Sequence, residues 1–326
     1  MPVSLGGTEA GRLYLGSTEF AQAYYGSVKI FDRTTPDPLN PLGLPAFTIR
    51  LVFNNPDGLY TQVYSADGTM VQISETPYVW DLTTNSSSWA NLLDYYHNGF
   101  TADRRSGGTV FVRPTGVLGA NSTGVTSMKQ MFRNASISDI PLFDTSSVTD
   151  MSEMFSSNSG PTSIPAFNTA NVTNMYRMFA SCRSLTAIPL LDTGKVTNME
   201  GICAACSGIT TLPNFDTSRV TNMSSAFYGC TSLTTVPLFD TSRVANFQEA
   251  FRLCTSLTYV PLLSLYNAVR TESMFDGCRA VTGGALDLYN AASLHPPSYH
   301  SYMFKNTGAD TTTGAAELAQ IPSGWK

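Results

Sequence analysis

The sequence predicts a mainly β protein with short helical turns: an N-terminal β-repeat anchor, a small β domain with one helix, and a C-terminal solenoid of 24-residue units. Three observations predict this. A dipeptide of Ile, Leu or Val followed by Pro returns every 24 residues and ends at Pro141, Pro165, Pro189, Pro213, Pro237 and Pro261. A second repeat, with a ten-residue step, occupies the N-terminus. Between them, short alternating runs are separated by N-P-D-G and A-D-G turns.

The shorter repeat occupies residues 1–33, with L-G-G-T-E at 5–9, L-G-S-T-E at 15–19 and Y-G-S-V-K at 25–29. Gly-Ser and Gly-Thr turns between short strands predict a small β meander or an intertwined β stalk, which is not stable without a partner surface. We interpret the segment as an anchor to another protein. Its missing core leads to the hypothesis of a homo-oligomer, specifically a homotrimer. An edge hairpin added to the next domain is the alternative.

A proline-rich linker and a small β domain follow the anchor. Four prolines in residues 34–45 predict a stiff linker. In the β domain, residues 46–118, alternation of apolar and polar positions predicts strands at 47–53, 59–65, 69–73, 78–82 and 107–112. Serine caps and apolar residues spaced by three and four predict its helix at 86–96.

The C-terminal repeat spans residues 119–305, with the unit D-T-S-x-V-T-N-M-x-x-M-F-x-x-C-x-S-L-T-x-I-P-x-F. One unit has too few apolar positions to bury a core, so stability must come from stacked copies. L-T-x-I before proline predicts a strand, D-T-S a turn, and M-x-x-M-F a short helical turn. A faded copy is expected at 302–304, and the polar tail, 306–326, is expected to be loose or to join an interface. The columns predicted to form the core are Val148, Val172, Val196, Val220, Val244; Phe155, Phe179, Phe227, Phe251, Phe275; and Leu185, Ile209, Leu233, Leu257.

The unit resembles the BspA-like leucine-rich repeats over about residues 121–305. The positions that carry the resemblance are Val220-Thr221, Met223, Ala226-Phe227, Cys230, Leu233 and Val236-Pro237. The resemblance implies a leucine-rich-repeat solenoid with one short strand per coil and surface adhesion as the commonest role, and it transfers no catalytic residue. The N-terminal L-G-S-T-E-x-x-x-x-Y pattern resembles the first segments of tailed-bacteriophage virion proteins that carry such repeats.

Composition and charge narrow the class of partner. The chain has 326 residues and a net charge of -5, which argues against nucleic acid as the main partner. No stretch is long and apolar enough to predict membrane insertion. The first residues have neither the basic region nor the apolar core of a secretory signal, so we expect none. This expectation favours a virion surface, assembled in the host cytoplasm, as the location.

Motifs for catalysis, metals and cofactors are not found. The histidines His97, His295 and His300 stand in unlike contexts, with no zinc-binding spacing and no triad around them. The sequence therefore predicts no enzyme, no metal and no cofactor. C-x-x-C at Cys203 and Cys206 is typical of a redox pair. However, Cys206 belongs to a 24-residue column, and we interpret that column as buried thiols, with disulfides between copies as the alternative. The column is Cys182, Cys206, Cys230, Cys254 and Cys278.

Two polar columns are candidates for binding. Asp144, Asn168, Asp192, Asp216 and Asp240 recur at the turn, where capping of the turn explains them with fewer assumptions than calcium binding. A threonine column follows the buried leucine and has a variable column beside it. Hydroxyl groups on an exposed strand face can bind sugars or partner loops, and they equally suit a solvated sheet. The candidate binding residues are Thr186, Thr210, Thr211, Thr234, Thr235, Thr258 and Tyr259.

These observations lead to a functional hypothesis. We expect a non-enzymatic bacteriophage virion surface protein, a tail or head fibre or decoration protein, whose solenoid binds a host receptor or glycan. Its N-terminal region would contact other virion proteins. The alternatives are a bacterial cell-surface adhesin and a purely structural decoration protein. A glycan hydrolase needs paired carboxylates in a cleft, which a repeated Asp column does not provide.

Overall fold

The structure, a computed structural model, describes residues 13–15, 18–20, 22–25, 28–32, 44, 46–53, 60–65, 68–75, 78–84, 86–93, 100–104, 109–111 and 114–326. The chain forms two compact units. The β unit comprises Met1–Ser88, Tyr96–Thr126 and Asp139–Ser147. The repeat unit comprises Trp89–Tyr95, Ser127–Ser138 and Val148–Lys326.

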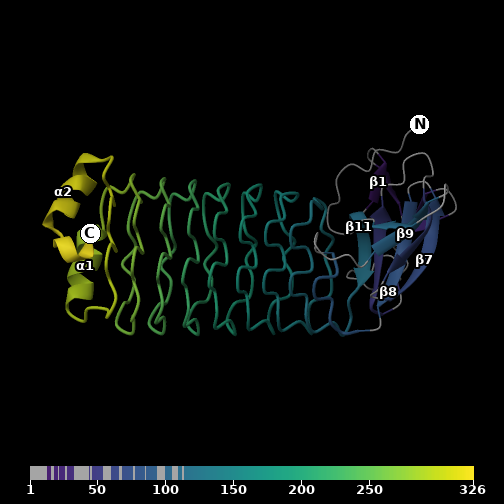
Figure 1. Cartoon of the computed structure of the whole chain (residues 1–326), viewed down its shortest axis with the longest axis horizontal. Coiled ribbons are helices and arrows are strands. Elements are labelled where there is room, and N and C mark those ends of the chain that lie inside the picture. The colour runs from purple at the N-terminus through teal and green to yellow at the C-terminus, as the bar shows by residue number, and fades with distance from the viewer. Residues whose placement is uncertain are drawn as a thin grey trace. The chain divides into compact units, whose positions relative to one another are not determined.

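The β unit contains a four-stranded antiparallel sheet, of which Figure 1 labels three strands, β11, β8 and β7. Its order is β11 (Pro114–Asn121), β5 (Thr48–Phe53), β8 (Tyr78–Thr84) and β7 (Gly68–Glu75). In β5, Ile49, Leu51 and Phe53 are buried. Arg50 is buried too, and its Nε lies 2.6 Å from Oδ1 of its cross-strand partner Asp81. Asp81 thus supplies a charged acceptor to the buried guanidinium of β5.

In its described part, the β unit also contains three smaller antiparallel sheets. One has the order β10 (Thr109–Phe111), β9 (Phe100–Arg104) and β6 (Tyr60–Ser65). The others pair β1 (Leu13–Leu15) with β2 (Thr18–Phe20), and β3 (Gln22–Tyr25) with β4 (Val28–Asp32). The mainly β class is thus confirmed, as are the strands predicted in the β domain, to within a few residues. β9 and β11 were not predicted. The predicted linker lies almost wholly outside the described residues.

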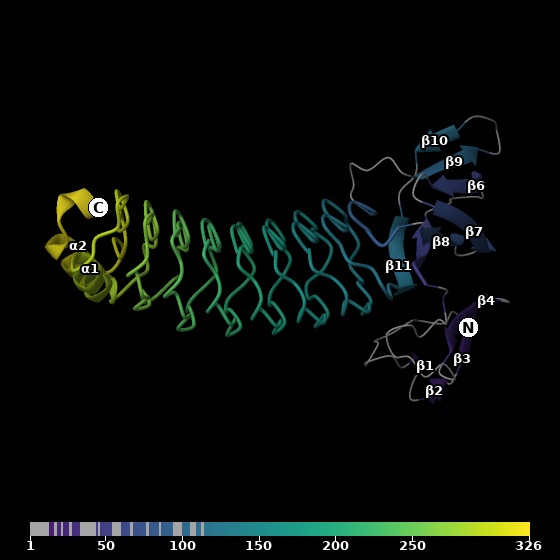
Figure 2. The ribbon, with the colours of Figure 1, turned by 90° about the horizontal axis from the view of Figure 1, so that it is seen from below.

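In the repeat unit, successive copies pair side by side through their backbones (Figures 1 and 2). The paired position is the Asn of T-N-M, which forms a parallel bridge to the same position of the next copy. The paired residues are Ser127, Asp150, Asn174, Asn198, Asn222, Asn246, Arg270 and Tyr299. The period that is visible in the sequence is therefore the period of backbone pairing.

Alternating amides hold neighbouring copies together. The N–H of Arg177 donates to the carbonyl of Glu200 in the next copy at 2.9 Å, whereas the next amide, that of Met178, closes a turn to the Met175 carbonyl at 3.1 Å. Arg177 has φ of 48°, in the left-handed region, and this reverses the chain so that alternate amides face the next copy. The equivalent residues Glu153, Gly201, Ser225, Glu249 and Ser273 share this conformation.

Two expectations for the repeat were wrong. M-x-x-M-F forms a pair of tight turns and no helical turn, because its amides bond to the next copy instead of continuing an i to i−4 ladder. L-T-x-I forms no strand in the described copies, because its backbone contacts are sparse: the Thr186 N–H donates to the Thr162 carbonyl at 3.1 Å, and an isolated bridge pairs Tyr259 with Gly283. Pairing between copies is concentrated in the segment from T-N-M through M-F instead.

The core of the repeat unit consists of columns of equivalent residues, as predicted. The predicted valine, phenylalanine and leucine columns are 0 % exposed throughout. Neighbouring phenylalanine rings stack, with centroids 5.8 Å apart for Phe155 and Phe179 and 5.2 Å for Phe251 and Phe275. Cys203 takes the phenylalanine position in one copy and is also buried. Each copy therefore covers the apolar face of its neighbour.

The helix predicted at 86–96 is not found in its described part, 86–93. Instead, this segment is a further copy of the stack: the N–H groups of Trp89, Asn91 and Leu93 donate at 2.8 Å to carbonyls of residues 127, 129 and 131. Asn91 has φ of 61°, like its counterparts in later copies. The helical prediction failed because the apolar spacing of three and four is shared by a helix and by this pair of turns.

Two helices lie at the C-terminal end of the repeat unit (Figure 2), α1 (Ala285–Ser293) and α2 (Thr312–Gln320), followed by the 3₁₀ turn η2 (Ser323–Trp325). The faded copy at 302–304 is confirmed, since the Phe275 N–H donates to the Met303 carbonyl at 2.8 Å. The tail is ordered and not loose. The Phe304 N–H donates to the Trp325 carbonyl, so the chain end provides the acceptor for this amide of the last copy.

Candidate binding surface

All seven candidate residues from the threonine and variable columns are exposed. The threonine hydroxyl groups also take part in pairing between copies. Thr234 Oγ1 donates to the Thr210 carbonyl at 3.2 Å, and Thr258 Oγ1 donates to the Thr234 carbonyl at 3.1 Å. Thr186 Oγ1 donates in the same way to the Thr162 carbonyl. These oxygens retain accepting lone pairs, so the column can accept hydrogen bonds from a ligand.

Tyr259 lies against the C-terminal end of the repeat unit. Its side chain is 53 % exposed, and its hydroxyl lies 3.4 Å from Oδ2 of Asp287 in α1. A Cβ on Gly284 would lie 2.8 Å from the tyrosine ring, so only glycine fits beneath it. Desolvation, followed by the Asp287 charge, raises the pKa of Tyr259 above its ordinary value. Tyr259 therefore packs on the helical end while keeping one face exposed.

The Asp column caps turns, which confirms the capping interpretation. The Ser218 N–H donates to Oδ1 of Asp216, and the Ser242 N–H donates to Oδ1 of Asp240, each at 3.0 Å. Hydrogen bonds from Ser218 and Ser242 lower the pKa of the respective carboxyl groups, so both stay ionised. Among the described residues, no group of three or more His, Cys, Asp or Glu side chains is arranged to hold a metal ion.

The cysteine column is buried, which confirms the packing interpretation. Its thiols donate to carbonyls of the preceding copies, for example Cys206 Sγ to the Phe179 carbonyl at 2.9 Å and Cys278 Sγ to the Phe251 carbonyl at 3.1 Å. Burial raises the pKa of Cys278 to about 12, and it raises the pKa of Cys203 well above the ordinary value. Raised pKa values make these thiols poor nucleophiles, which disfavours the redox interpretation.

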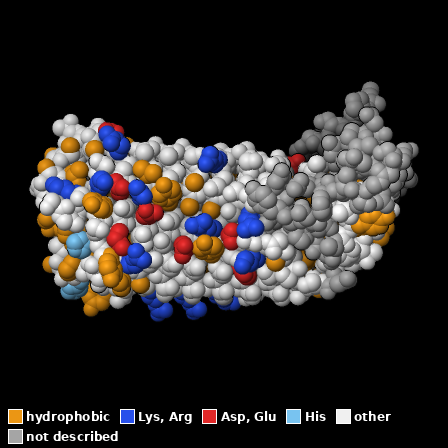
Figure 3. Space-filling view, viewed as in Figure 1, with side chains coloured by type: hydrophobic (Ala, Val, Ile, Leu, Met, Phe, Trp, Pro, Cys, Tyr) orange, Lys and Arg blue, Asp and Glu red, His pale blue; other side chains and the backbone are white. Residues whose placement is uncertain are grey.

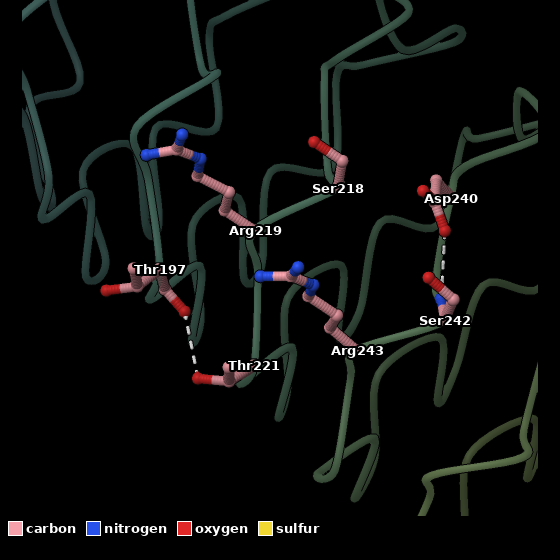
Figure 4. A pocket seen from close by; sticks show the side chains of 7 residues that line it. All are labelled: Thr197, Ser218, Arg219, Thr221, Asp240, Ser242 and Arg243. Carbon is pink, nitrogen blue, oxygen red and sulfur yellow. Dashed lines mark hydrogen bonds between the residues drawn. The ribbon is translucent and has the colours of Figure 1, made fainter.

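A column of cations was missed by the sequence interpretation. Lys195, Arg219 and Arg243 occupy the same position in three consecutive copies, three residues after each Asp, and all are exposed. We call these three residues the cationic band. An open hollow of about 620 Å³ lies along it, lined by Thr197, Ser218, Arg219, Thr221, Asp240, Ser242 and Arg243 (Figure 4). The 24-residue spacing of the cations was the signal in the sequence.

The face of the repeat unit seen in Figure 3 mixes positive and negative side chains. Oppositely charged side chains of the repeat unit pair with each other: Arg252 contacts Glu249 at 2.7 Å and Asp276 at 3.2 Å. Arg270 contacts Glu272 at 2.9 Å. In contrast, neither guanidinium of the cationic band forms an ion pair with another described residue. The band is thus a place where positive charge is available to a ligand.

The repeat also decides the family. A profile described as "Mycoplasma protein of unknown function, DUF285" matches residues 113–211 and 205–313, which together exceed half of the chain. The chain belongs to the DUF285 family. The match supports a BspA-like repeat protein, in agreement with the resemblance of the unit. Searches of curated proteins and of solved structures each returned no match for this DUF285 protein. In the described part of the chain, no helix has the length and hydrophobicity of a membrane-spanning segment.

Proposed function

We propose that this DUF285 protein is a non-enzymatic surface protein of a tailed-bacteriophage virion, and that its repeat unit binds a receptor or glycan on the host surface. We infer that the repeat unit is a leucine-rich-repeat-type solenoid. Residues 1–33 would attach this solenoid to other virion proteins. The observation that carries the proposal is the rigid row of exposed positions that vary beside fixed ones, such as Thr211, Thr235 and Tyr259. A rigid scaffold with variable exposed positions suits recognition.

Two features support binding over catalysis. The polar side chains that repeat in the array are used for pairing and capping, as Thr234 Oγ1 and Asp216 Oδ1 illustrate. The array also offers the same chemical groups in several copies, which favours extended contact with a partner over reaction at one point. The proposed location is the virion surface, and the proposed assembly is a homo-oligomer formed through residues 1–33.

The family match favours a second candidate, a bacterial cell-surface BspA-like adhesin. In both candidates the repeat unit binds a partner. They differ in the surface that displays the protein, a virion in the first and a bacterial cell in the second. Purified virions that contain the chain would support the first, and its recovery from bacterial envelopes would support the second.

Binding of the full-length chain to intact candidate host cells tests both. We expect saturable binding that is lost in the variant T211R/T235R, because two arginine side chains obstruct the exposed face. The control, A319R/Q320R, adds the same charge to exposed positions of α2 and should bind normally. If the chain binds no permissive host but binds virions that lack it, a purely structural decoration role is the better conclusion.

A further inference from the structure

We propose that the cationic band of Lys195, Arg219 and Arg243 is a binding site for a linear anionic polysaccharide, which lies along the repeat unit with its anionic groups on successive copies. This inference rests on the proposed function, because it names the class of ligand. It adds a contact on the D-T-S turns to the one proposed for the exposed threonine face.

The cations of the band lie along the stack. Lys195 Nζ donates to Oδ1 of Asn171, the equivalent residue of the preceding copy, at 2.7 Å. In Figure 4 the side chains of Arg219 and Arg243 extend in the same direction, each reaching toward the preceding copy. The three cationic side chains therefore follow one another along the stack as a line of repeat-equivalent positions. The line ends at amide side chains, since Asn171 and Asn267 hold the same position in the flanking copies.

The neighbouring carboxylates bond mainly within their own turns. Asp240 also lines the hollow, but its oxygens accept hydrogen bonds from the Ser242 N–H and hydroxyl. Figure 4 shows it on the side of the hollow opposite the Arg243 guanidinium. Asp216 is held in the same way by Ser218. The largest contributions to the lowered pKa of Asp216 and Asp240 come from these turn donors, and the attraction to Arg219 and Arg243 is a smaller one. Neither guanidinium forms a close ion pair with a described residue.

The geometry favours a polymer over a small anion. Paired backbones lie about 4.8 Å apart, so the three cations extend over roughly 10 Å along the stack. A guanidinium binds carboxylate, sulfate or phosphate groups through two parallel hydrogen bonds. Hydroxyl groups of Thr197, Thr221 and Ser218 line the same hollow and can bind sugar hydroxyls between the charges. A chain with regularly spaced acidic groups and hydroxyls satisfies both kinds of contact together.

The test uses the full-length chain and defined polymers: polygalacturonate for carboxylate, dextran sulfate for sulfate and poly(glycerol phosphate) for phosphodiester groups. Neutral dextran is the negative control. We expect at least one charged polymer to bind, with an affinity that falls steeply as salt is raised. The variant K195Q/R219Q/R243Q should weaken that binding at least tenfold. A matched variant, K129Q/R183Q/K305Q, removes three exposed cations that do not share a repeat position and should bind like the original chain.

Each outcome decides the proposal. Equal losses in the two variants would mean that binding follows total charge, and the site would be rejected. Absence of binding to all three polymers, or tighter binding of single-stranded DNA, would also overturn it. Cell binding separates this inference from the proposed function. If K195Q/R219Q/R243Q binds host cells as well as the original chain, the cationic band is rejected as the binding site, whereas the proposed host binding by the repeat unit is retained. If no cells are bound at all, the proposed function fails.

Discussion

The β unit and the repeat unit satisfy their backbones and fill their cores in different ways. In the β unit, antiparallel strands such as β5 and β8 pair residue by residue, and a buried ion pair joins Arg50 of β5 to Asp81 of β8. In the repeat unit, each copy repeats one set of turns, and each core position recurs as a column. In the repeat unit, equivalent buried residues of neighbouring copies therefore pack against each other, whereas the Arg50–Asp81 pair of the β unit belongs to no repeat.

The largest effect is expected in the phenylalanine column. Phe227 is fully buried and stacks on Phe251 with ring centroids 5.4 Å apart. Phe227→Ala should lower the free energy of unfolding by about 4 kcal/mol, because it removes a large side chain and leaves a cavity between two copies. Urea denaturation measures the change. Leu238→Ala, at a side chain 75 % exposed, is the control and should change stability by less than about 0.5 kcal/mol. Similar losses for both would contradict a stacked core.

A somewhat smaller loss of stability is expected when the Arg50–Asp81 ion pair of the β unit is broken. Asp81→Asn removes the carboxylate that pairs with Arg50, whose side chain is 9 % exposed, and should cost about 3 kcal/mol because the buried guanidinium loses this charged acceptor. The double variant R50L/D81L removes both charges and should recover much of this loss. Denaturation followed by near-ultraviolet circular dichroism measures both. If the double variant is no more stable than D81N, the buried pair is not the source of the effect.

A third comparison concerns two threonine columns of the repeat unit. Thr217 is 1 % exposed, and its Oγ1 donates to the Asp240 carbonyl of the next copy at 2.8 Å. Thr217→Val keeps the shape but leaves that carbonyl without its donor, at a cost of about 1 to 2 kcal/mol. Thr234→Val, in the exposed column, should cost less than about 0.5 kcal/mol because water replaces the hydroxyl. Thermal unfolding of the two variants measures the two losses of stability. Equal losses would contradict a different role for the buried and the exposed threonine column.

The smallest effect is a dependence on pH that belongs to the cysteine column. Burial raises the pKa of Cys278 from 9.0 to about 12, so the folded chain keeps a proton that the unfolded chain releases in this range. Stability should therefore be full below pH 9.0 and fall as pH rises toward about 12. Denaturant midpoints measured on both sides of pH 9 test this. Cys278→Ala should reduce the slope, and an unchanged slope would assign it to other groups.

The same contrast explains which predictions from the sequence succeeded. Burial of Val220, Phe227 and Leu233 could be predicted because each recurs in a column, and so could turn capping by Asp216. The helix at 86–96 and the L-T-x-I strand failed because side-chain spacing alone does not say where the amides donate. In residues 89–93 they donate to residues 127–131, far along the chain, and not to the turn before. β9 and β11 were not predicted because they contain Ala, Asp, Pro, Gly and Asn, which are depleted in strands.

The candidate site divides in the same way. Thr211 and Thr235 are exposed, as expected for polar residues at a position that varies between copies, and the sequence alone also contains the column of Lys195, Arg219 and Arg243. Only the tertiary structure shows that the carboxylates beside this column are bonded within their own turns and that Tyr259 packs at the helical end. The sequence by itself thus determined the period, the core columns and the family, because these depend on residue identity at a fixed step. The partners of charges and amides were decided by the fold, because the copies meet across the stack.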